Sequence, residues 1–302
     1  MIDKSNSLIS LGVGSNQIPL IKAAIKKGYK VIGIDQNINQ AFKINGLEKI
    51  KCSTYEAEKI IEILPEYLKH EEPKGLLLRS TGPSLISAAL INDRYKLRSI
   101  SKELAYASVR KSILREQCKL LHIPTIAGKI FNNFENIDFK WGNKVIKPDI
   151  PIVGKKNVFL PKNKSEAKIS FIEAQNESHN KLVEVQDYID GLDLTLMAFC
   201  NNSLLSNSLI LEEWVGVKNS EFFGIGISIF KNTKFKDIII QMQMYAKEFI
   251  KYWKISFGIV FFTFRLDENK KLKLYEVNPG LAGDNIVDLL LPRAFKKNKT
   301  YF

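Results

Sequence analysis

The spacing of apolar and polar residues divides the chain into two parts. In the first hundred residues, short apolar runs that are typical of buried strands alternate with stretches in which apolar residues recur at helical spacing. Predicted strands cover residues 8–14, 29–35 and 75–79, and predicted helices cover 18–27, 56–69 and 84–91. Strands and helices in alternation predict an α/β fold with a parallel, doubly wound sheet over residues 1–100.

Residues 101–302 show a different pattern. Helical spacing covers 101–121 and ends before Pro124, and a long amphipathic stretch covers 235–253. A shorter helix is predicted at 165–175, and strands at 128–131, 144–147, 158–160, 181–186, 194–200, 203–211, 257–266 and 272–277. Many strands in succession predict an α+β fold with antiparallel sheets.

Composition narrows the classes of protein. The 302 residues are 45% hydrophobic, which is enough for a core, but no apolar run approaches the roughly 20 residues that cross a membrane. The start of the chain, MIDKSNS, is polar and has no apolar signal core, so we expect a cytoplasmic protein. Three cysteines and three histidines are scattered, which gives little basis for a disulfide framework, a zinc site or a Ser-His-Asp triad.

The net charge of +13 has two interpretations. It reflects either a solvated lysine-rich surface or attraction to an anion such as a nucleotide or an acidic metabolite. No basic stripe is interleaved with aromatic residues, so a nucleic acid is an unlikely partner.

The first predicted strand ends in a glycine turn. Gly12 and Gly14 follow it, and Asp35 ends the next strand, an arrangement typical of dinucleotide sites in which glycines admit a pyrophosphate and the acid binds a ribose. The third glycine of that motif is replaced by Gln17. The turn is therefore either plain fold geometry or a site for NAD(P), and the second reading would make the protein an oxidoreductase.

The last predicted strand ends in YEVNPG and carries a candidate metal site. Glu276 and Asn278 are two residues apart, so both side chains project from one face of an extended segment. A carboxylate and an amide carbonyl suit Mg²⁺ or Mn²⁺ carrying a phosphate, and they suit zinc poorly. Asn-Pro-Gly is also ordinary turn chemistry.

A basic segment lies in the middle of the chain. Lys147 ends a predicted strand, and the loop after it contains Gly154, Lys155 and Lys156. Backbone amides and ammonium groups in such a loop could offset the charge of a triphosphate. The alternative is a basic hairpin with a solvated turn.

The next predicted strand runs into a polar linker. Gln186 and Asp193 could supply side-chain contacts to an adenine amino group and to a ribose, and the backbone of Tyr188 and Ile189 could bind the edge of the base. The alternative is a strand, a turn and a further strand.

The order of these segments resembles that of the ATP-grasp superfamily, and the resemblance covers nearly the whole chain. It implies a Rossmann-like domain over 1–100 followed by a two-lobed ATP-grasp domain over 101–302. The lobes are expected at about 128–186 and 187–302, with linker helices at 101–122. It also implies ATP with Mg²⁺ or Mn²⁺ as cofactors. The positions that match the family's binding residues are Lys111 and Lys147 for phosphate, 154–158 for the phosphate-covering loop, Gln186, Tyr188 and Ile189 for adenine, Asp193 for ribose, and Glu276 and Asn278 for metal.

Two positions depart from the family pattern. Thr263 stands where an acid is usual, and Gly280 stands where an arginine is frequent. Asp284 is a candidate for restoring the charge. Arg265, on the same strand face as Thr263, either points into the site as a catalytic residue or is exposed to solvent. The departures leave open an unusual active enzyme, a weak enzyme, or a nucleotide-binding relative without catalysis.

The resemblance implies a ligase reaction. A substrate carboxylate attacks the γ-phosphate of ATP, and an amine displaces phosphate from the acyl phosphate. An amino acid or a peptide is the candidate substrate. Arg79 ends a strand beside the crevice where open α/β sheets bind ligands, so it is the candidate for holding the substrate carboxylate. Its alternative is an ion pair at a strand end. Formation of a homo-oligomer is left open.

Overall fold

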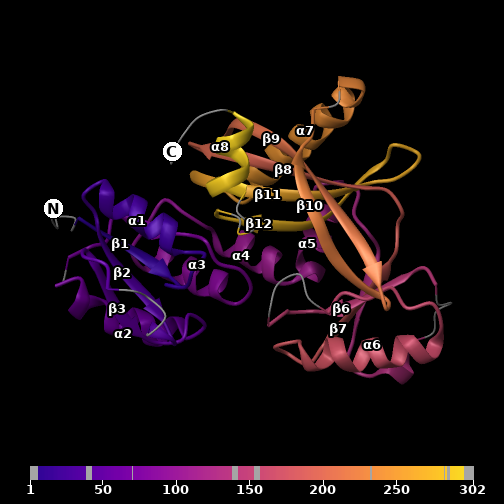
Figure 1. Cartoon of the computed structure of the whole chain (residues 1–302), viewed down its shortest axis with the longest axis horizontal. Helices are drawn as coiled ribbons and strands as arrows, with labels where there is room; N and C mark the ends of the chain where they lie inside the picture. The colour runs from indigo at the N-terminus through magenta and orange to yellow at the C-terminus, as the bar shows by residue number, and fades with distance from the viewer. Residues whose placement is uncertain are drawn as a thin grey trace.

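A four-stranded parallel sheet forms the N-terminal part of the computed structural model (Figure 1), with the order β3–β2–β1–β4. The structure describes residues 6–38, 43–69, 71–137, 142–152, 157–231, 233–281, 283 and 286–295. The elements of this part are β1 (Ser7–Leu11), α1 (Ile18–Lys26), β2 (Lys30–Asp35), β3 (Leu47–Lys51), α2 (Ala57–Tyr67), β4 (Gly75–Leu77) and α3 (Ser84–Arg94). The predicted parallel sheet is confirmed, with β3 as an additional strand that the sequence pattern did not reveal.

Helices cover both faces of this sheet. Ile9 and Ile32 belong to the core cluster that includes α2 and α3, whereas Val31 packs in a separate cluster with Ile21 of α1. Neighbouring residues of a strand point to opposite faces, so both faces must be covered by apolar groups. The doubly wound arrangement expected from the sequence is confirmed.

A five-stranded antiparallel sheet forms the largest part of the molecule, with the order β10–β9–β8–β11–β12. Its elements are β8 (Leu192–Asn201), β9 (Leu204–Lys218), β10 (Glu221–Ile229), β11 (Phe257–Leu266) and β12 (Leu272–Pro279), and α7 (Lys236–Tyr252) packs against it. Phe249 stacks on Trp253 with ring centroids 4.4 Å apart, and Trp253 stacks on Phe262 of β11. These rings fix α7 against one face of the sheet and leave the other face available for a site.

A smaller three-stranded sheet, with the order β5–β7–β6, carries α6 (Figure 1). The elements are β5 (Gly128–Phe131), β6 (Lys144–Pro148), α6 (Lys164–Asn176) and β7 (Val183–Asp187). Phe159 bridges Ile146 of β6 and Glu221 of β10, so the small sheet is tied to the tip of the large one. The predicted strand at 158–160 is wrong, because only this isolated bridge forms there.

The helical stretch predicted over 101–121 is two helices, α4 (Lys102–Val109) and α5 (Lys111–Leu120), which lie between the sheets (Figure 1). Arg110 has extended φ and ψ angles of −118° and 107°, which end one helix and begin the next. A single helix was therefore the wrong prediction at Arg110. The break makes Lys111 the first residue of α5.

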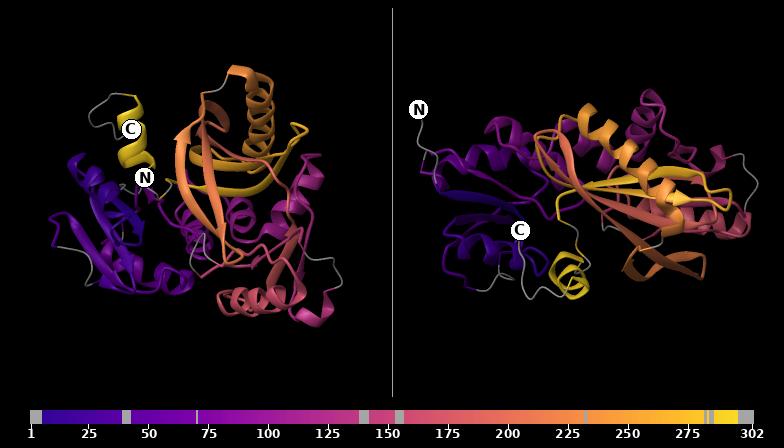
Figure 2. Two further views of the ribbon diagram at one scale, coloured as in Figure 1. Left: turned by 45° about the vertical axis from the view of Figure 1, so that its right-hand side comes forward. Right: turned by 90° about the horizontal axis from the view of Figure 1, so that it is seen from above.

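The last described residues lie beside the N-terminal part. A π-helical turn (Ile286–Leu290) leads into α8 (Leu291–Ala294), which lies between the N-terminal part and the large sheet in both figures (Figure 2).

Strand β10 was also missed by the sequence pattern, because two glycines interrupt its alternation. None of the helices in the described residues combines the length and apolar character that crossing a bilayer requires.

Candidate functional site

A cavity of about 660 Å³ opens between the small sheet, the large sheet and the start of α5. Its walls bring together most of the residues that the sequence singled out. The predicted residues that line it are Lys111, Lys147, Gln186, Tyr188, Ile189, Asp193, Arg265, Glu276 and Asn278. Residues that are far apart in the sequence thus share one cavity, and the role of each stays a prediction.

Lys147 lies in a buried polar network at one wall of the cavity. Its ammonium group donates to the side-chain carbonyl of Gln186 and lies 3.3 Å from Glu184. Glu184, fully buried on β7, also pairs with Arg115 of α5. Sequence reasoning missed Glu184, although it lies two residues before Gln186 and therefore on the same strand face.

The two lysines of the cavity create a site that favours anions. Burial, and then the nearby charge of Lys111, hold the pKa of Lys147 well below its usual range. Lys111 begins α5, where the helix dipole is also positive. Lys111 at the N-terminus of α5 and Lys147 on β6 repel one another when both are charged, and a bound phosphate would relieve that repulsion.

The linker between β7 and β8 offers backbone groups to the cavity. The Tyr188 N–H donates to the carbonyl of Asn143, 2.9 Å away. The N–H of Tyr188 is thus used within the protein, and the predicted contact of Tyr188 and Ile189 with a nucleobase stays a prediction. The Tyr188 ring lies near that of Phe222, with centroids 6.2 Å apart.

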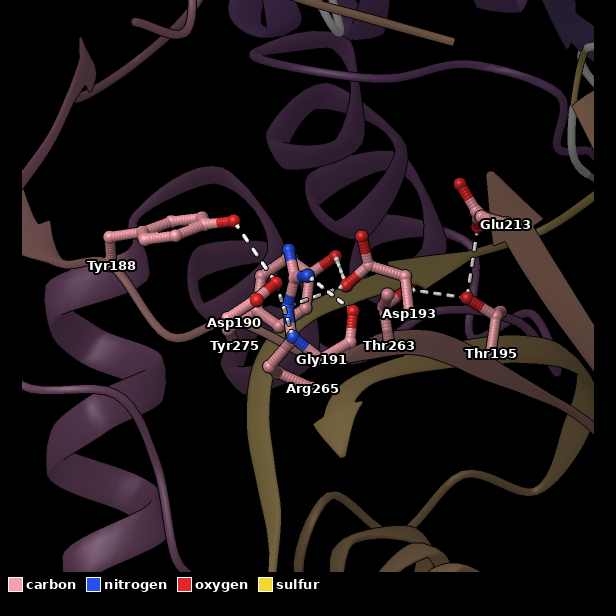
Figure 3. Close-up of polar contacts among 9 residues, drawn as sticks. All are labelled: Tyr188, Asp190, Gly191, Asp193, Thr195, Glu213, Thr263, Arg265 and Tyr275. Atoms are coloured by element: carbon pink, nitrogen blue, oxygen red, sulfur yellow. Dashed lines mark hydrogen bonds and ion pairs between the residues drawn. The ribbon is translucent and has the colours of Figure 1, made fainter. Parts of the chain in front are cut away.

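Asp193 is held by two side chains (Figure 3). The Tyr275 hydroxyl donates to its Oδ1 at 3.0 Å, and Arg265 Nε lies 3.1 Å from the same oxygen. Burial raises the pKa of Asp193 to about 6, in spite of the favourable charge of Arg265. The carboxylate is therefore buried and oriented, and its pKa lies closer to neutral pH than that of an ordinary carboxylate.

Arg265 faces the cavity and not the solvent, so the solvent-exposed alternative is wrong. It donates to the carbonyl of Gly191 and pairs with Asp193. Arg265 lies opposite Asp193 in the sheet, whereas Phe261 lies opposite Asn278. The position favours a role in holding Asp193 over the predicted role in catalysis at the metal end.

A β-bulge shapes the strand that carries the predicted metal ligands. The register shifts so that Thr263 lies opposite Glu276 and Phe264 lies opposite Leu274, which makes Tyr275 an extra residue. At a bulge two residues oppose one, so Tyr275 and Glu276 both face the cavity. Asn278 follows on the same face and donates its amide N–H to Glu276 Oε1 at 3.1 Å.

The groups at Glu276 and Asn278 fit Mg²⁺ or Mn²⁺. The Asn278 amide nitrogen donates to Glu276, so the amide oxygen of Asn278 is the atom that could bind a cation beside that carboxylate. No cluster of three or more His, Cys, Asp or Glu side chains able to hold a metal occurs among the described residues. Two oxygen ligands suit Mg²⁺, which keeps several waters and takes further oxygens from phosphate.

Thr263, at the position where an acid was expected, is part of a hydrogen-bonded row (Figure 3). Its hydroxyl lies 3.0 Å from that of Thr195 on β8, which lies 2.9 Å from Glu213 Oε1 on β9. Glu213 lines the cavity. Sequence reasoning missed Thr195 and Glu213, because only the pairing of β8 with β9 and β11 brings them to this place.

Arg79 is not among the residues that line the cavity. It is 4% exposed, pairs with Asp288 at 2.5 Å and donates to the carbonyl of Asn16. This geometry favours the alternative of an ion pair at a strand end over the predicted contact with a substrate carboxylate.

Four candidate residues lie outside the described residues. They are Gly154, Lys155, Lys156 and Asp284. The described residues on either side of the first three, Ile152 and Val158, line the cavity.

The glycine turn after β1 is filled by the protein itself. A side chain added at Gly12 would meet Gln17 at 3.0 Å, and the Asp35 carboxylate accepts from the backbone N–H groups of Val13 and Asn37. Gln17 also donates to the carbonyl of Arg79. These contacts occupy the groups that a dinucleotide would use, so they argue against NAD(P).

Gly280 cannot be replaced by the family's arginine at this place. Its φ is +87°, and an added Cβ would lie 2.5 Å from the carbonyl oxygen of Leu78. The next residue, Leu281, donates to that same carbonyl. Close approach of two backbones therefore explains this departure from the family pattern.

Comparison with solved structures identifies the fold. An L-amino acid ligase from Bacillus licheniformis superposes over 97% of this chain and 71% of its own, with a TM-score of 0.73 and 14% identity. The chain has the ATP-grasp fold. No family model matches the sequence, and a search of curated proteins finds no match.

Two further ATP-grasp structures show the same extent of similarity. Phosphoribosylglycinamide synthetase from Anaerococcus prevotii is 19% identical, with a TM-score of 0.65 over 96% of this chain and 71% of its own. The biotin carboxylase domain of 2-oxoglutarate carboxylase from Hydrogenobacter thermophilus, solved with MgADP, ADP and bicarbonate, is 14% identical, with a TM-score of 0.65 over 99% and 71%. At these identities the comparison establishes the fold alone.

Proposed function

We propose that the protein is an ATP-dependent ligase that activates a carboxylate as an acyl phosphate and joins it to an amine. The observation that carries the proposal is the convergence of the predicted phosphate, base, ribose and metal residues on one cavity. The arrangement in an ATP-grasp fold supports it, because that fold is shared with a ligase that acts on L-amino acids.

The residues have distinct tasks in this proposal. Lys111 and Lys147 offset phosphate charge, Asp193 binds the ribose hydroxyls, and Glu276 and Asn278 hold Mg²⁺, which offsets charge on the phosphates when it is bound. The lowered pKa of Lys147 favours its neutral form, and the negative charge of a bound polyphosphate would raise that pKa and favour the charged ammonium. The walls of the cavity limit access of water to the acyl phosphate.

The reaction requires no side-chain nucleophile. An oxygen of the substrate carboxylate attacks the γ-phosphorus and the bond to the ADP oxygen breaks. The amine nitrogen then attacks the acyl carbon, loses a proton, and phosphate leaves with the carboxylate oxygen. The products are an amide, ADP and phosphate, and the protein contributes positioning and electrostatic stabilisation.

Transfer of an isotopic label tests this order of bonds. Pools of ¹⁸O-carboxylates and amines are incubated with ATP and Mg²⁺, and the phosphate released is examined by mass spectrometry. We expect one ¹⁸O in the phosphate, formed together with ADP, and a hydroxamate when hydroxylamine replaces the amine. Phosphate without label during ADP release would contradict the proposal.

Lys147 provides the matched pair of variants. Lys147→Met is expected to weaken ATP binding about tenfold or more, since a hydrogen bond to a charged group contributes about 1.5–3 kcal/mol. Lys129→Met, which alters an exposed lysine of the same small sheet, is the control. Isothermal titration gives both affinities, and equal losses would contradict the role of Lys147.

A second candidate is a nucleotide-binding protein without turnover. Thr263 in place of an acid and the glycine required at position 280 favour it. ATP binding with no ADP release, across all pools and at high protein concentration, would support this candidate over the ligase.

A further inference from the structure

We propose that Glu213 supplies the second carboxylate of the divalent-cation site, in place of the acid that the ATP-grasp pattern has where this chain has Thr263. The inference rests on the proposed function, because it concerns the same cation. It assigns a role to a residue of β9, two strands away from β11.

The strand order places Glu213 within reach of this site. Glu276, Thr263 and Thr195 lie opposite one another on β12, β11 and β8. Glu213 lies on the next strand, β9, and its carboxylate reaches back to the Thr195 hydroxyl at 2.9 Å. Both glutamates therefore flank the small hydroxyl side chains between them, and both line the cavity.

The available protons decide which groups donate and which accept in the hydrogen-bonded row Thr263–Thr195–Glu213. An ionised carboxylate can only accept, so Thr195 gives its single proton to Glu213. Thr195 must then accept the proton of Thr263, whose oxygen lies 3.0 Å away. The donor of Thr263 is thereby used within the row, and its oxygen can offer only lone pairs to the cavity, as a cation requires.

The small, uncharged side chain of Thr263, in place of the family's acid, is compatible with the carboxylate of Glu213 nearby. A carboxylate at position 263 would lie beside the Thr195 hydroxyl and compete with Glu213 for the same hydrogen bond. Threonine instead leaves room between the two glutamates. Both carboxylates line the cavity, and a divalent cation between them would offset the repulsion of their charges.

Mn²⁺ binding in the presence of saturating ADP tests the inference. Free and bound Mn²⁺ are separated by their electron paramagnetic resonance signals, so no turnover is needed. Glu213→Gln keeps the acceptor for Thr195 and removes only the charge. The matched control is Glu212→Gln, on the same strand but outside the cavity lining, and metal-free ADP affinity reports that each variant is folded.

We expect Glu213→Gln to weaken Mn²⁺ binding about tenfold or more, in the range found when groups that support a metal are removed, with Glu212→Gln unchanged. Adding Thr263→Asp to Glu213→Gln is expected to restore much of the affinity. Equal Mn²⁺ affinity in Glu213→Gln and Glu212→Gln would overturn the inference.

Glu276→Gln separates this inference from the proposed function. If Glu276→Gln loses Mn²⁺ and Glu213→Gln does not, only the role of Glu213 is wrong. If neither variant changes Mn²⁺ affinity, the cation does not bind at these residues, and the metal site assigned in the ligase proposal is wrong.

Discussion

Asp193 is buried at the wall of the cavity, and its titration follows from that position. A carboxyl group in a dry environment prefers its neutral form, so its pKa is raised from 3.8 to about 6. Tyr275 and Arg265 partly oppose this effect by stabilising the ionised form. The residue therefore changes charge in a range where most carboxylates do not.

Nucleotide affinity should consequently depend on pH. Above about pH 6 Asp193 is ionised and, in its proposed role, accepts from ribose hydroxyls. Below that pH it is protonated and loses acceptor capacity, so the affinity should fall as pH falls. Adenosine, which lacks titrating phosphates, is the suitable ligand for calorimetry between about pH 5 and pH 8. Asp193→Asn should bind weakly and without this pH dependence, and an identical profile in both proteins would refute the assignment.

Single residues of the site differ in how far they could be predicted. Lys147, Glu276 and Asn278 are recognisable because their neighbours in the sequence show where a strand ends and which face they share. Thr195 and Glu213 are not recognisable, because a contact between strands depends on register that the local pattern does not contain.

At the scale of elements, most helices and strands followed the apolar period, but β3, β10 and the break at Arg110 were missed. Arg110 separates α4 from α5, and the break contains no proline or glycine, so no local sequence signal marked it. Strand β10 was hidden by glycines and by a register shift between Gly224 and Gly226. The pattern thus predicts most regular segments and misses the irregular residues at Arg110 and in β10.

The turn that ends β12 depends on a glycine. Gly280→Ala should destabilise the fold by about 2–4 kcal/mol, because a positive φ and a clash with Leu78 both add to the cost. Gly258→Ala is the matched control, since Gly258 also has a positive φ but nothing lies within 4 Å of an added Cβ. Urea unfolding of both variants measures the difference, and equal losses would show that the contact with Leu78 costs nothing.

At the scale of the whole molecule, buried contacts join the N-terminal sheet to the C-terminal segment. Arg79, after β4, pairs with Asp288, and the carbonyl of Leu78 accepts from Leu281. The side chain of Arg79 is 3% exposed and that of Asp288 is 15% exposed. A pair that is this dry ties together two regions far apart in the sequence.

Breaking this pair should loosen the connection. Asp288→Asn leaves a buried guanidinium without its carboxylate, at a cost of about 3–5 kcal/mol, whereas Asp93→Asn in the exposed pair with Lys102 should cost at most about 1 kcal/mol. Calorimetry should show the N-terminal part of Asp288→Asn melting earlier. Arg79→Met with Asp288→Leu should recover much of the loss, and failure to do so would point to a role beyond pairing.

The extra residue in β12 has a consequence for how related chains can diverge. Leu272 and Leu274 are buried before Tyr275, and Val277 and Pro279 are buried after it. Without Tyr275 the strand would alternate regularly, and Glu276 and Asn278 would keep their face. A relative with a one-residue gap at this position would therefore lack the hydroxyl that holds Asp193 and keep the proposed cation ligands, so one half of the proposed site can change without the other.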